Sequence, residues 1–101
     1  MKNTKTALRY AKAILNLSKD SKLESTVNKD MLLVAQTIAE NKDLDVMLHS
    51  PVIKVEDKRK VLDSLFSGKV NKLTLGLFHL LEENKRMEML EAVAKKYTII
   101  Y

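Results

Sequence analysis

The side chains that could support catalysis or metal binding are few and lie far apart in this sequence. The chain has no cysteine, which excludes disulfide bonds, cysteine zinc sites and thiol nucleophiles. His79 and Glu83 have the four-residue spacing that places two metal ligands on one helix face, whereas His49 belongs to a different predicted helix. Two residues do not complete a metal site, so we interpret this pair as solvated surface charge.

Other catalytic arrangements are also missing from the sequence. The two glycines, Gly68 and Gly76, are too few and too isolated for a phosphate-binding loop. The neighbouring carboxylates Asp43 and Asp45 have the residue types of a general acid–base pair but are typical of a helix surface. We therefore predict no catalytic residue, no bound cofactor and no metal site, and we predict that the chain is not an enzyme.

The net charge points to binding rather than to catalysis. The chain has 18 Lys and Arg against 13 Asp and Glu, which gives a formal net charge of +5 at pH 7. That balance suits an acidic partner, an anionic membrane or nucleic acid. The first predicted helix aligns one polar stripe, as a DNA-recognition helix would. The stripe consists of Lys5, Arg9, Lys12, Asn16 and Lys19.

A small basic helical nucleic-acid-binding domain is therefore an alternative function for this chain. Against it, the sequence contains only three arginines, and bidentate recognition of bases favours Arg. The charges are also scattered, with no block of five or six like charges. We expect no nucleic-acid partner.

The elements that carry these residues are predicted to be helices. Apolar residues make up 46% of the 101 residues, while Gly occurs twice and Pro once, a composition typical of one small helical domain. No apolar run approaches the ~18 residues that a membrane span needs. We predict an all-α fold, a single-domain six-helix bundle. The predicted helices cover about 5–18, 23–40, 42–49, 55–66, 72–83 and 86 onward, with 97–101 extending the last helix.

Several residues predict where these helices begin and end. Thr4, Asn41 and Asn71 have the residue types that cap helix N-termini. Pro51 disfavours helical backbone at the residue before it and so ends the third helix, and Gly68 suits a left-handed position after the fourth. The second predicted helix has an apolar stripe of Val27, Met31, Val34 and Ile38, widened by Leu32 and Ala35. In the fourth, the side chains predicted to point inward are Val61, Leu62, Leu65 and Phe66.

The first and fifth predicted helices are apolar over an unusually wide part of their circumference. At about 100° per residue, the apolar residues of each helix cover roughly 220°, although a bundle helix needs a stripe of little more than about 100°. Two explanations remain open. Both helices could be central and contacted on several sides, or part of each arc could stay exposed and form a groove for a partner helix.

The motifs of the sequence resemble one known family. The run Arg-Tyr-Ala-Lys-Ala at residues 9–13 resembles the opening of ATP synthase delta subunits and of their mitochondrial counterpart, the oligomycin-sensitivity-conferring protein. Further similarities follow in order along nearly the whole chain. They are Asn41 with Leu44 and Leu48, Ser-Pro-Val-Ile at 50–53, Lys58 with Leu62 and residues 65–66, Leu-Thr-Leu at 73–75 with Leu80 and Leu81, residues 83–87, and Tyr97. Lys85, where the family usually has Gly, and the mid-helix Gly76 depart from the pattern.

The resemblance implies a non-catalytic stator adaptor of the F-type ATP synthase. It implies that the N-terminal six-helix domain, here residues 1–101, binds the N-terminal helix of an alpha subunit in a groove between its first and fifth helices. A separate C-terminal domain, which we expect to be missing here, would bind the b-subunit peripheral stalk. The expected location is the cytoplasmic face of the bacterial inner membrane, peripheral and without insertion.

The residues that would line this groove follow from the resemblance by position. For each leucine among them, ordinary core packing remains an open alternative, and for the small residues the alternative is simple helix packing. The predicted groove residues are Tyr10, Ala13, Ile14 and Leu17 in the first helix and Leu73, Gly76, Leu77 and Leu80 in the fifth.

Overall fold

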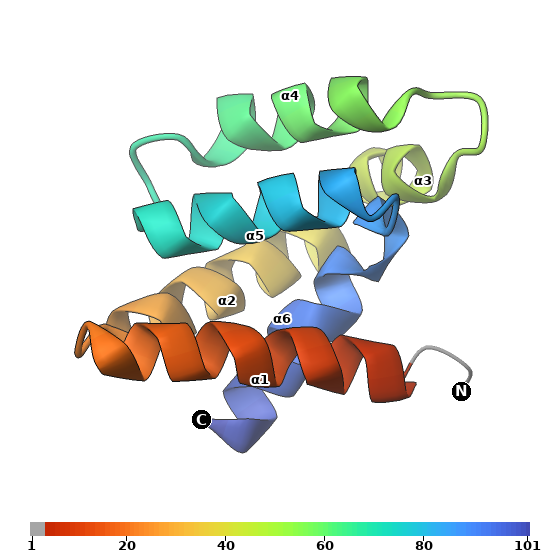
Figure 1. Cartoon of the computed structure of the whole chain (residues 1–101). Coiled ribbons are helices and arrows are strands. Elements are labelled where there is room, and N and C mark those ends of the chain that lie inside the picture. The colour runs from red at the N-terminus through yellow and green to blue at the C-terminus, as the bar shows by residue number, and fades with distance from the viewer. Residues whose placement is uncertain (1–3) are drawn as a thin grey trace.

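A computed structural model describes residues 4–101, which contain helices and no strand (Figure 1). The predicted all-α, six-helix fold is confirmed, with one additional single-turn 3-10 helix, η1. The elements are α1 (Thr4–Asp20), α2 (Glu24–Glu40), α3 (Lys42–His49), α4 (Val55–Phe66), α5 (Lys72–Glu83), η1 (Met87–Met89) and α6 (Leu90–Ile100).

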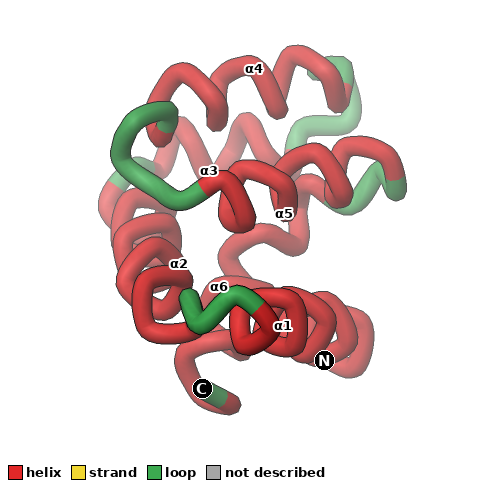
Figure 2. The backbone as a smooth tube through the Cα atoms, turned by 60° about the vertical axis from the view of Figure 1, so that its left-hand side comes forward, coloured by secondary structure: helices red, strands yellow, loops and turns green. Residues whose placement is uncertain are grey.

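The helices form one bundle in which α6 packs against both α1 and α2. In Figures 1 and 2, α4 and α5 lie together on one side, and α1 and α6 lie on the other. The buried rings of Phe66 and Phe78, 5.7 Å apart, join α4 to α5. Tyr97 of α6 is fully buried, donates a hydrogen bond to the Glu24 carbonyl at 2.8 Å and lies 3.0 Å from Ser18 Oγ. One core thus joins all the helices.

Two lysines adopt left-handed backbone where helices end. Lys22 follows α1 with φ 57°, and Lys85 follows α5 with φ 56°. After α5, the Arg86 N–H donates to the Leu81 carbonyl at 2.8 Å and the Lys85 N–H to the Glu82 carbonyl at 3.1 Å. This hydrogen-bond pair is the Schellman motif, which satisfies carbonyls at a helix end. Lys85 therefore adopts the conformation for which the family usually has Gly.

The capping predictions are confirmed in part. Asn71 caps α5, because its Oδ1 accepts a hydrogen bond from the Leu73 N–H at 2.9 Å. Asn41 precedes α3 but makes no cap; its Nδ2 donates to the Thr37 carbonyl at 2.8 Å, satisfying the last turn of α2 instead. Thr4 is itself helical, as the first described residue of α1, so its prediction as the cap before the helix is wrong. Gly68 has φ 79°, as expected after α4.

The core predictions are confirmed in part for both α2 and α4. In α2 the four residues at helical spacing are buried and Ala35 is half-buried, but Leu32 is 52% exposed. In α4, Leu62 and Phe66 are buried, but Val61 and Leu65 are 39% and 40% exposed. Lys58 is buried in their place and donates from Nζ to the Leu48 carbonyl at 3.0 Å. This contact puts a cation at the C-terminal end of α3, where the helix dipole favours positive charge.

The end of the chain follows the predicted helix. The sixth segment begins as η1 at Met87, one residue after the predicted start, and α6 continues to Ile100. The helical prediction for residues 97–101 is thus confirmed up to Ile100, and the rings of Tyr97 and Tyr101 stack with centroids 6.1 Å apart. None of the helices within residues 4–101 is long and apolar enough to cross a membrane.

Candidate functional site

A groove lies between α1 and α5, which contact each other and run in opposite directions (Figure 1). At the end formed by the start of α1 and the end of α5, the groove holds a hollow of about 350 Å³. This hollow is open to solvent and is lined by both apolar and polar residues. Its lining residues are Thr6, Arg9, Tyr10, Ala13, Leu80 and Asn84.

Three of the four α1 residues predicted for the groove are accessible. Tyr10 is half-buried, Ala13 is exposed and Leu17 is 52% exposed. Their spacing of three and four residues places them on one stripe of the helix. Ile14, by contrast, is only 4% exposed and packs in the core. Contrary to prediction, Ile14 therefore does not line the groove but packs beneath it in the core.

The α5 residues divide in the same way. Leu73 and Leu80 are half-buried and Gly76 is exposed, whereas Leu77 is completely buried. Leu77 therefore supports the groove from the core, as Ile14 does. A Cβ atom added at Gly76 would meet no atom within 4 Å, so packing within residues 4–101 does not require glycine there. Six of the eight predicted residues are thus accessible, and three of them, Tyr10, Ala13 and Leu80, line the hollow together.

A hydrogen bond that the sequence did not indicate crosses one end of the groove. Asn84, which follows the last residue of α5, donates from Nδ2 to Tyr10 Oη at 2.7 Å. Thr6 and Arg9 also border the groove without having been predicted. Only helical periodicity could have indicated that these residues border the groove. Thr6 precedes Tyr10 by four residues, Arg9 precedes Ala13 by four, and Asn84 follows Leu80 by four.

A buried carboxylate from α2 holds the other end of α5. Asp30 is 7% exposed, and its Oδ2 accepts hydrogen bonds from the Asn71 N–H at 2.7 Å and from Thr74 Oγ1 at 2.8 Å. A carboxylate that accepts from a helix N-terminus forms a strong, charge-assisted contact. This contact fixes the start of α5, directly before the groove residue Leu73.

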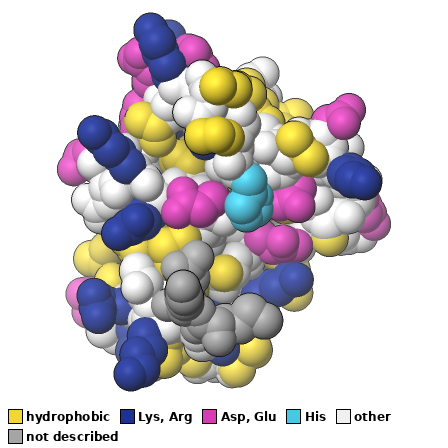
Figure 3. All heavy atoms as spheres, turned by 90° about the vertical axis from the view of Figure 1, so that its right-hand side faces the viewer, with side chains coloured by type: hydrophobic (Ala, Val, Ile, Leu, Met, Phe, Trp, Pro, Cys, Tyr) yellow, Lys and Arg dark blue, Asp and Glu magenta, His cyan; other side chains and the backbone are white. Residues whose placement is uncertain are grey.

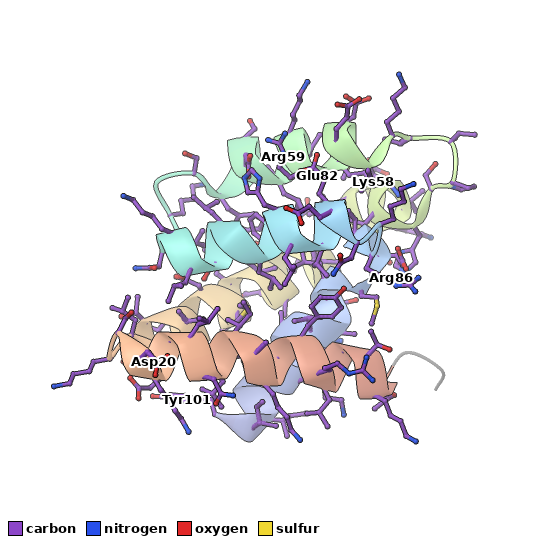
Figure 4. The ribbon with its side chains drawn as sticks, in the orientation of Figure 1. Asp20, Lys58, Arg59, Glu82, Arg86 and Tyr101 are labelled. Atoms are coloured by element: carbon purple, nitrogen blue, oxygen red, sulfur yellow. The ribbon has the colours of Figure 1, made fainter. Side chains whose placement is uncertain are left out.

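Outside the groove, charged side chains of α4 and α5 form ion pairs. Arg59 of α4 donates to Glu82 Oε1 and to Asp63 Oδ2, both at 2.9 Å, and joins α4 to α5 (Figure 4). The hydrogen bonds to Asp63 and Glu82 raise the pKa of Arg59 above its ordinary value. His79 lies 3.7 Å from Asp63 and 3.9 Å from Glu82. The predicted surface pairing of His79 with Glu83 is thus wrong in its partner, because α4 supplies a closer carboxylate.

The remaining His forms a pair that the sequence analysis missed. His49 Nδ1 lies 2.9 Å from the Asp45 carbonyl and 3.3 Å from its carboxylate, four residues earlier on α3. Within residues 4–101 no group of three or more His, Asp or Glu side chains is arranged to hold a metal ion.

Apolar side chains are also exposed outside the groove, and two such surfaces are useful for comparison. A hollow of about 330 Å³ lies between α2, α3 and α4, where Met47, Val61 and Leu65 contribute to its lining. The connection from α3 to α4 exposes Val52 at 87%, and apolar side chains gather on the upper part of that face (Figure 3). Both surfaces serve as internal comparisons for experiments on the α1–α5 groove.

Comparison with known proteins identifies the family to which the chain belongs. A sequence model described as ATP synthase delta (OSCP) subunit matches residues 6–101. The chain belongs to this family. It is 43% identical over 101 residues to the ATP synthase subunit delta of Flavobacterium psychrophilum, and this match covers 100% of the chain and 56% of that protein. It is 33% identical over 93 residues to the chloroplastic ATP synthase subunit delta of Pyropia yezoensis, which covers 92% of the chain and 50% of that protein.

Membership of the delta family confirms the resemblance carried by residues 9–13 and the later motifs. Both helices of the groove lie within the matched residues, apart from the first two residues of α1. The chain spans about half the length of the curated relatives it matches. Functions that belong to a whole delta subunit are therefore taken up below as proposals for this chain.

Proposed function

We propose that this delta-family chain is a non-catalytic stator adaptor of the F-type ATP synthase, which binds the N-terminal helix of an alpha subunit between α1 and α5. The observation that carries the proposal is the accessible stripe of Tyr10, Ala13 and Leu17 beside Leu73, Gly76 and Leu80. In the assembled enzyme the adaptor would join the catalytic head to the b-subunit peripheral stalk through a further C-terminal domain. It would lie peripherally on the cytoplasmic face of a bacterial inner membrane.

The dimensions and chemistry of the groove suit an amphipathic helix. α1 has 17 residues and is therefore about 25 Å long, close to the ~30 Å of a 20-residue partner helix. Side chains at i, i+3, i+4 and i+7 of such a helix would cover the exposed Leu17 and the half-buried Tyr10 and Leu80. Burial of apolar surface contributes about 25 cal/mol per Å², and the aromatic ring of Tyr10 adds a large contact area at little entropic cost.

Small residues on both sides would allow close approach. Ala13 on α1 and Gly76 on α5 are both exposed, and the space above Gly76 is free of neighbouring atoms. A glycine inside a helix costs roughly 1 kcal/mol relative to alanine. A partner backbone that contacts Gly76 would give a reason for a residue that the isolated domain does not need.

Nucleic-acid binding remains the second candidate because of the stripe on α1. Lys5, Lys12 and Lys19 are all exposed on the solvent side of that helix. Phosphate contacts alone would give binding that weakens steeply with salt and would leave the apolar groove unused. Membership of the delta family favours the helix-binding function.

The test is a titration of isotope-labelled protein with a peptide of about 20 residues from an alpha-subunit N-terminus. Binding is monitored through changes in the backbone NMR chemical shifts of the protein. We expect saturable shifts that cluster on residues 7–17 and 73–84. The α2–α3–α4 hollow and the α3–α4 connection act as internal references. Shifts confined to those references would move the site elsewhere. Absence of shifts, together with salt-sensitive binding of duplex DNA, would favour the second candidate.

A further inference from the structure

The exposed charges on the groove elements are strongly unbalanced. α1, α5 and the turn after α5 carry seven exposed basic residues and two exposed acidic ones, Asp20 and Glu83. The other acidic residue of these elements, Glu82, is half-buried and paired with Arg59. The seven basic residues are Lys5, Arg9, Lys12, Lys19, Lys72, Lys85 and Arg86.

This excess accounts for the net charge of the whole chain. The sequence has 18 basic and 13 acidic residues; outside the nine exposed charges of the groove elements, 11 basic and 11 acidic residues cancel. Elsewhere, Lys95 pairs with Glu91 at 3.4 Å, whereas other exposed lysines of the described residues, such as Lys29 and Lys60, form no ion pair within 4 Å. Among residues 4–101, none of the seven groove cations forms an ion pair within 4 Å. The excess of five positive charges on the groove elements therefore equals the formal net charge of the chain.

Several of these cations lie near the apolar stripe. Arg9 borders the hollow itself, and Lys5 and Lys12 lie on the neighbouring outer side of α1, within a turn of it. Lys85 and Arg86 follow α5 at the end where Asn84 contacts Tyr10. Figure 4 places Arg86 at that end of the groove and Asp20 at the opposite end. Any ligand on the stripe would thus lie beside unpaired positive charges.

We propose that the groove selects a helix that is acidic as well as amphipathic, with carboxylates on the flanks of its apolar face. This inference rests on the proposed function and adds the chemistry of the partner. Carboxylates placed beside Arg9, Lys5 and Lys12 would complement charges that nothing in residues 4–101 neutralises. Because the cations stay solvated at the rim, they act mainly by steering association and by rejecting basic helices.

The apolar side chains of the groove distinguish an acidic helix from other polyanions. Leu17 is 52% exposed and Leu80 is half-buried beside the hollow. A phosphate backbone would leave these side chains in contact with water, whereas an amphipathic helix would cover them. The juxtaposition of an open apolar stripe with unpaired cations therefore fits an acidic helix better than nucleic acid.

The test uses three designed peptides of about 20 residues that share one apolar stripe and carry Glu, Gln or Lys on both flanks. Affinities are measured by calorimetry and association rates by stopped flow, at low and high salt. At low salt we expect the Glu peptide to bind about tenfold more tightly than the Gln peptide, mainly through faster association. The difference should shrink at 1 M salt, where the Debye length falls to about 3 Å.

A matched pair of protein variants isolates the groove charges. The double variant Lys5→Gln/Lys12→Gln should lose most of the preference for the Glu peptide. The control Lys29→Gln/Lys60→Gln removes two exposed lysines from α2 and α4 and should retain that preference, although the net charge changes equally. An equal loss in both variants would overturn the inference, because net charge alone would then explain the preference.

The remaining outcomes separate the inference from the function on which it rests. Equal affinity for the Glu and Gln peptides, or tighter binding of the Lys peptide, overturns the acidic-partner inference and leaves the helix-binding groove intact. Failure of all three peptides to shift resonances of α1 and α5 overturns both. Displacement of a bound Glu peptide by low concentrations of duplex DNA would also overturn the acidic-partner inference, because phosphate would then be the preferred anion.

Discussion

Asn84 donates a hydrogen bond to Tyr10 Oη at 2.7 Å and thereby connects the end of α5 to α1. At the opposite end of α5, Asp30 holds the N–H of Asn71 and the hydroxyl of Thr74. The fifth helix is thus fixed at both ends, from α1 and from α2, before any partner is present. A site held in position in this way loses less conformational entropy on binding, which raises affinity.

Ala13→Asp should weaken partner binding strongly without unfolding the domain. Ala13 is exposed in the unoccupied groove, so the new carboxylate remains in water until a partner helix covers it. Binding would then bury an unpaired charge, which is costly. We expect the affinity for the alpha-subunit peptide to fall by about 30-fold or more, equivalent to about 2 kcal/mol, as measured by calorimetry. Thermal unfolding should be little changed.

The control for this prediction is Ala11→Asp, two residues away on the same helix. Ala11 is completely buried, so its carboxylate would enter the core and strongly destabilise the fold. Circular dichroism should therefore show a large fall in melting temperature for Ala11→Asp and almost none for Ala13→Asp. If Ala13→Asp unfolds the domain instead, the groove assignment of Ala13 is wrong.

Gly76→Ala should increase stability and weaken partner binding. The new methyl group meets no atom within 4 Å, and alanine is favoured over glycine inside a helix by roughly 0.5–1 kcal/mol. Urea denaturation should show that increase in the free energy of unfolding. Where a partner backbone contacts Gly76, the same methyl group would hinder it, and calorimetry should show weaker peptide binding. Stabilisation without any loss of affinity would show that the partner does not approach this residue.

Gly68→Ala provides the comparison for the backbone part of this argument. Gly68 also has free space around it, but its φ of 79° lies in the left-handed region. Alanine there should destabilise the domain by about 1 kcal/mol and leave the groove affinity unchanged. Opposite signs at the two glycines would separate helix propensity from backbone strain.

Local patterns predicted the helices and most of the groove well. The scarcity of Gly and Pro gave the six helices, and the bounds of α3, α4 and α5 match the predicted ones. The wide apolar arcs indicated that α1 and α5 have more apolar surface than one core contact needs, and Leu17 and Leu80 are indeed accessible. Periodicity could not decide which residues of each arc are covered, so Ile14 and Leu77 were included although both are buried.

The contacts that hold the groove in place were not predictable from the sequence. Asp30 lies 41 residues from Asn71, and Tyr10 lies 74 residues from Asn84. No local pattern specifies such pairs, because they depend on how helices distant in sequence pack. Lys58 was missed for a related reason: its burial becomes favourable only when the end of α3 offers a carbonyl to its ammonium group.

Asp30→Asn should loosen the start of α5. An asparagine keeps the shape of the side chain but loses the charge that strengthens the bonds from Asn71 and Thr74, and it adds a buried amide donor. We expect a loss of about 1–3 kcal/mol in the free energy of unfolding. Hydrogen exchange should accelerate most at residues 71–75. Asp43→Asn, at an exposed site on α3, is the control; equal effects of both changes would contradict a specific role for Asp30.

Tyr97 should make the stability of the domain fall at alkaline pH. Burial raises the pKa of Tyr97 above its ordinary value of about 10, so the unfolded chain loses this proton at lower pH than the folded one. The stabilising contribution is therefore complete below about pH 10 and is lost as the pH rises through the folded pKa. Urea denaturation between pH 8 and pH 11 should show this decline.

Tyr97→Phe is the control for this prediction. It should lower the free energy of unfolding by about 1 kcal/mol at pH 7 through the lost hydrogen bond to the Glu24 carbonyl. Its free energy of unfolding should change less with pH above pH 10. Parallel profiles of the two proteins would mean that other groups cause the decline.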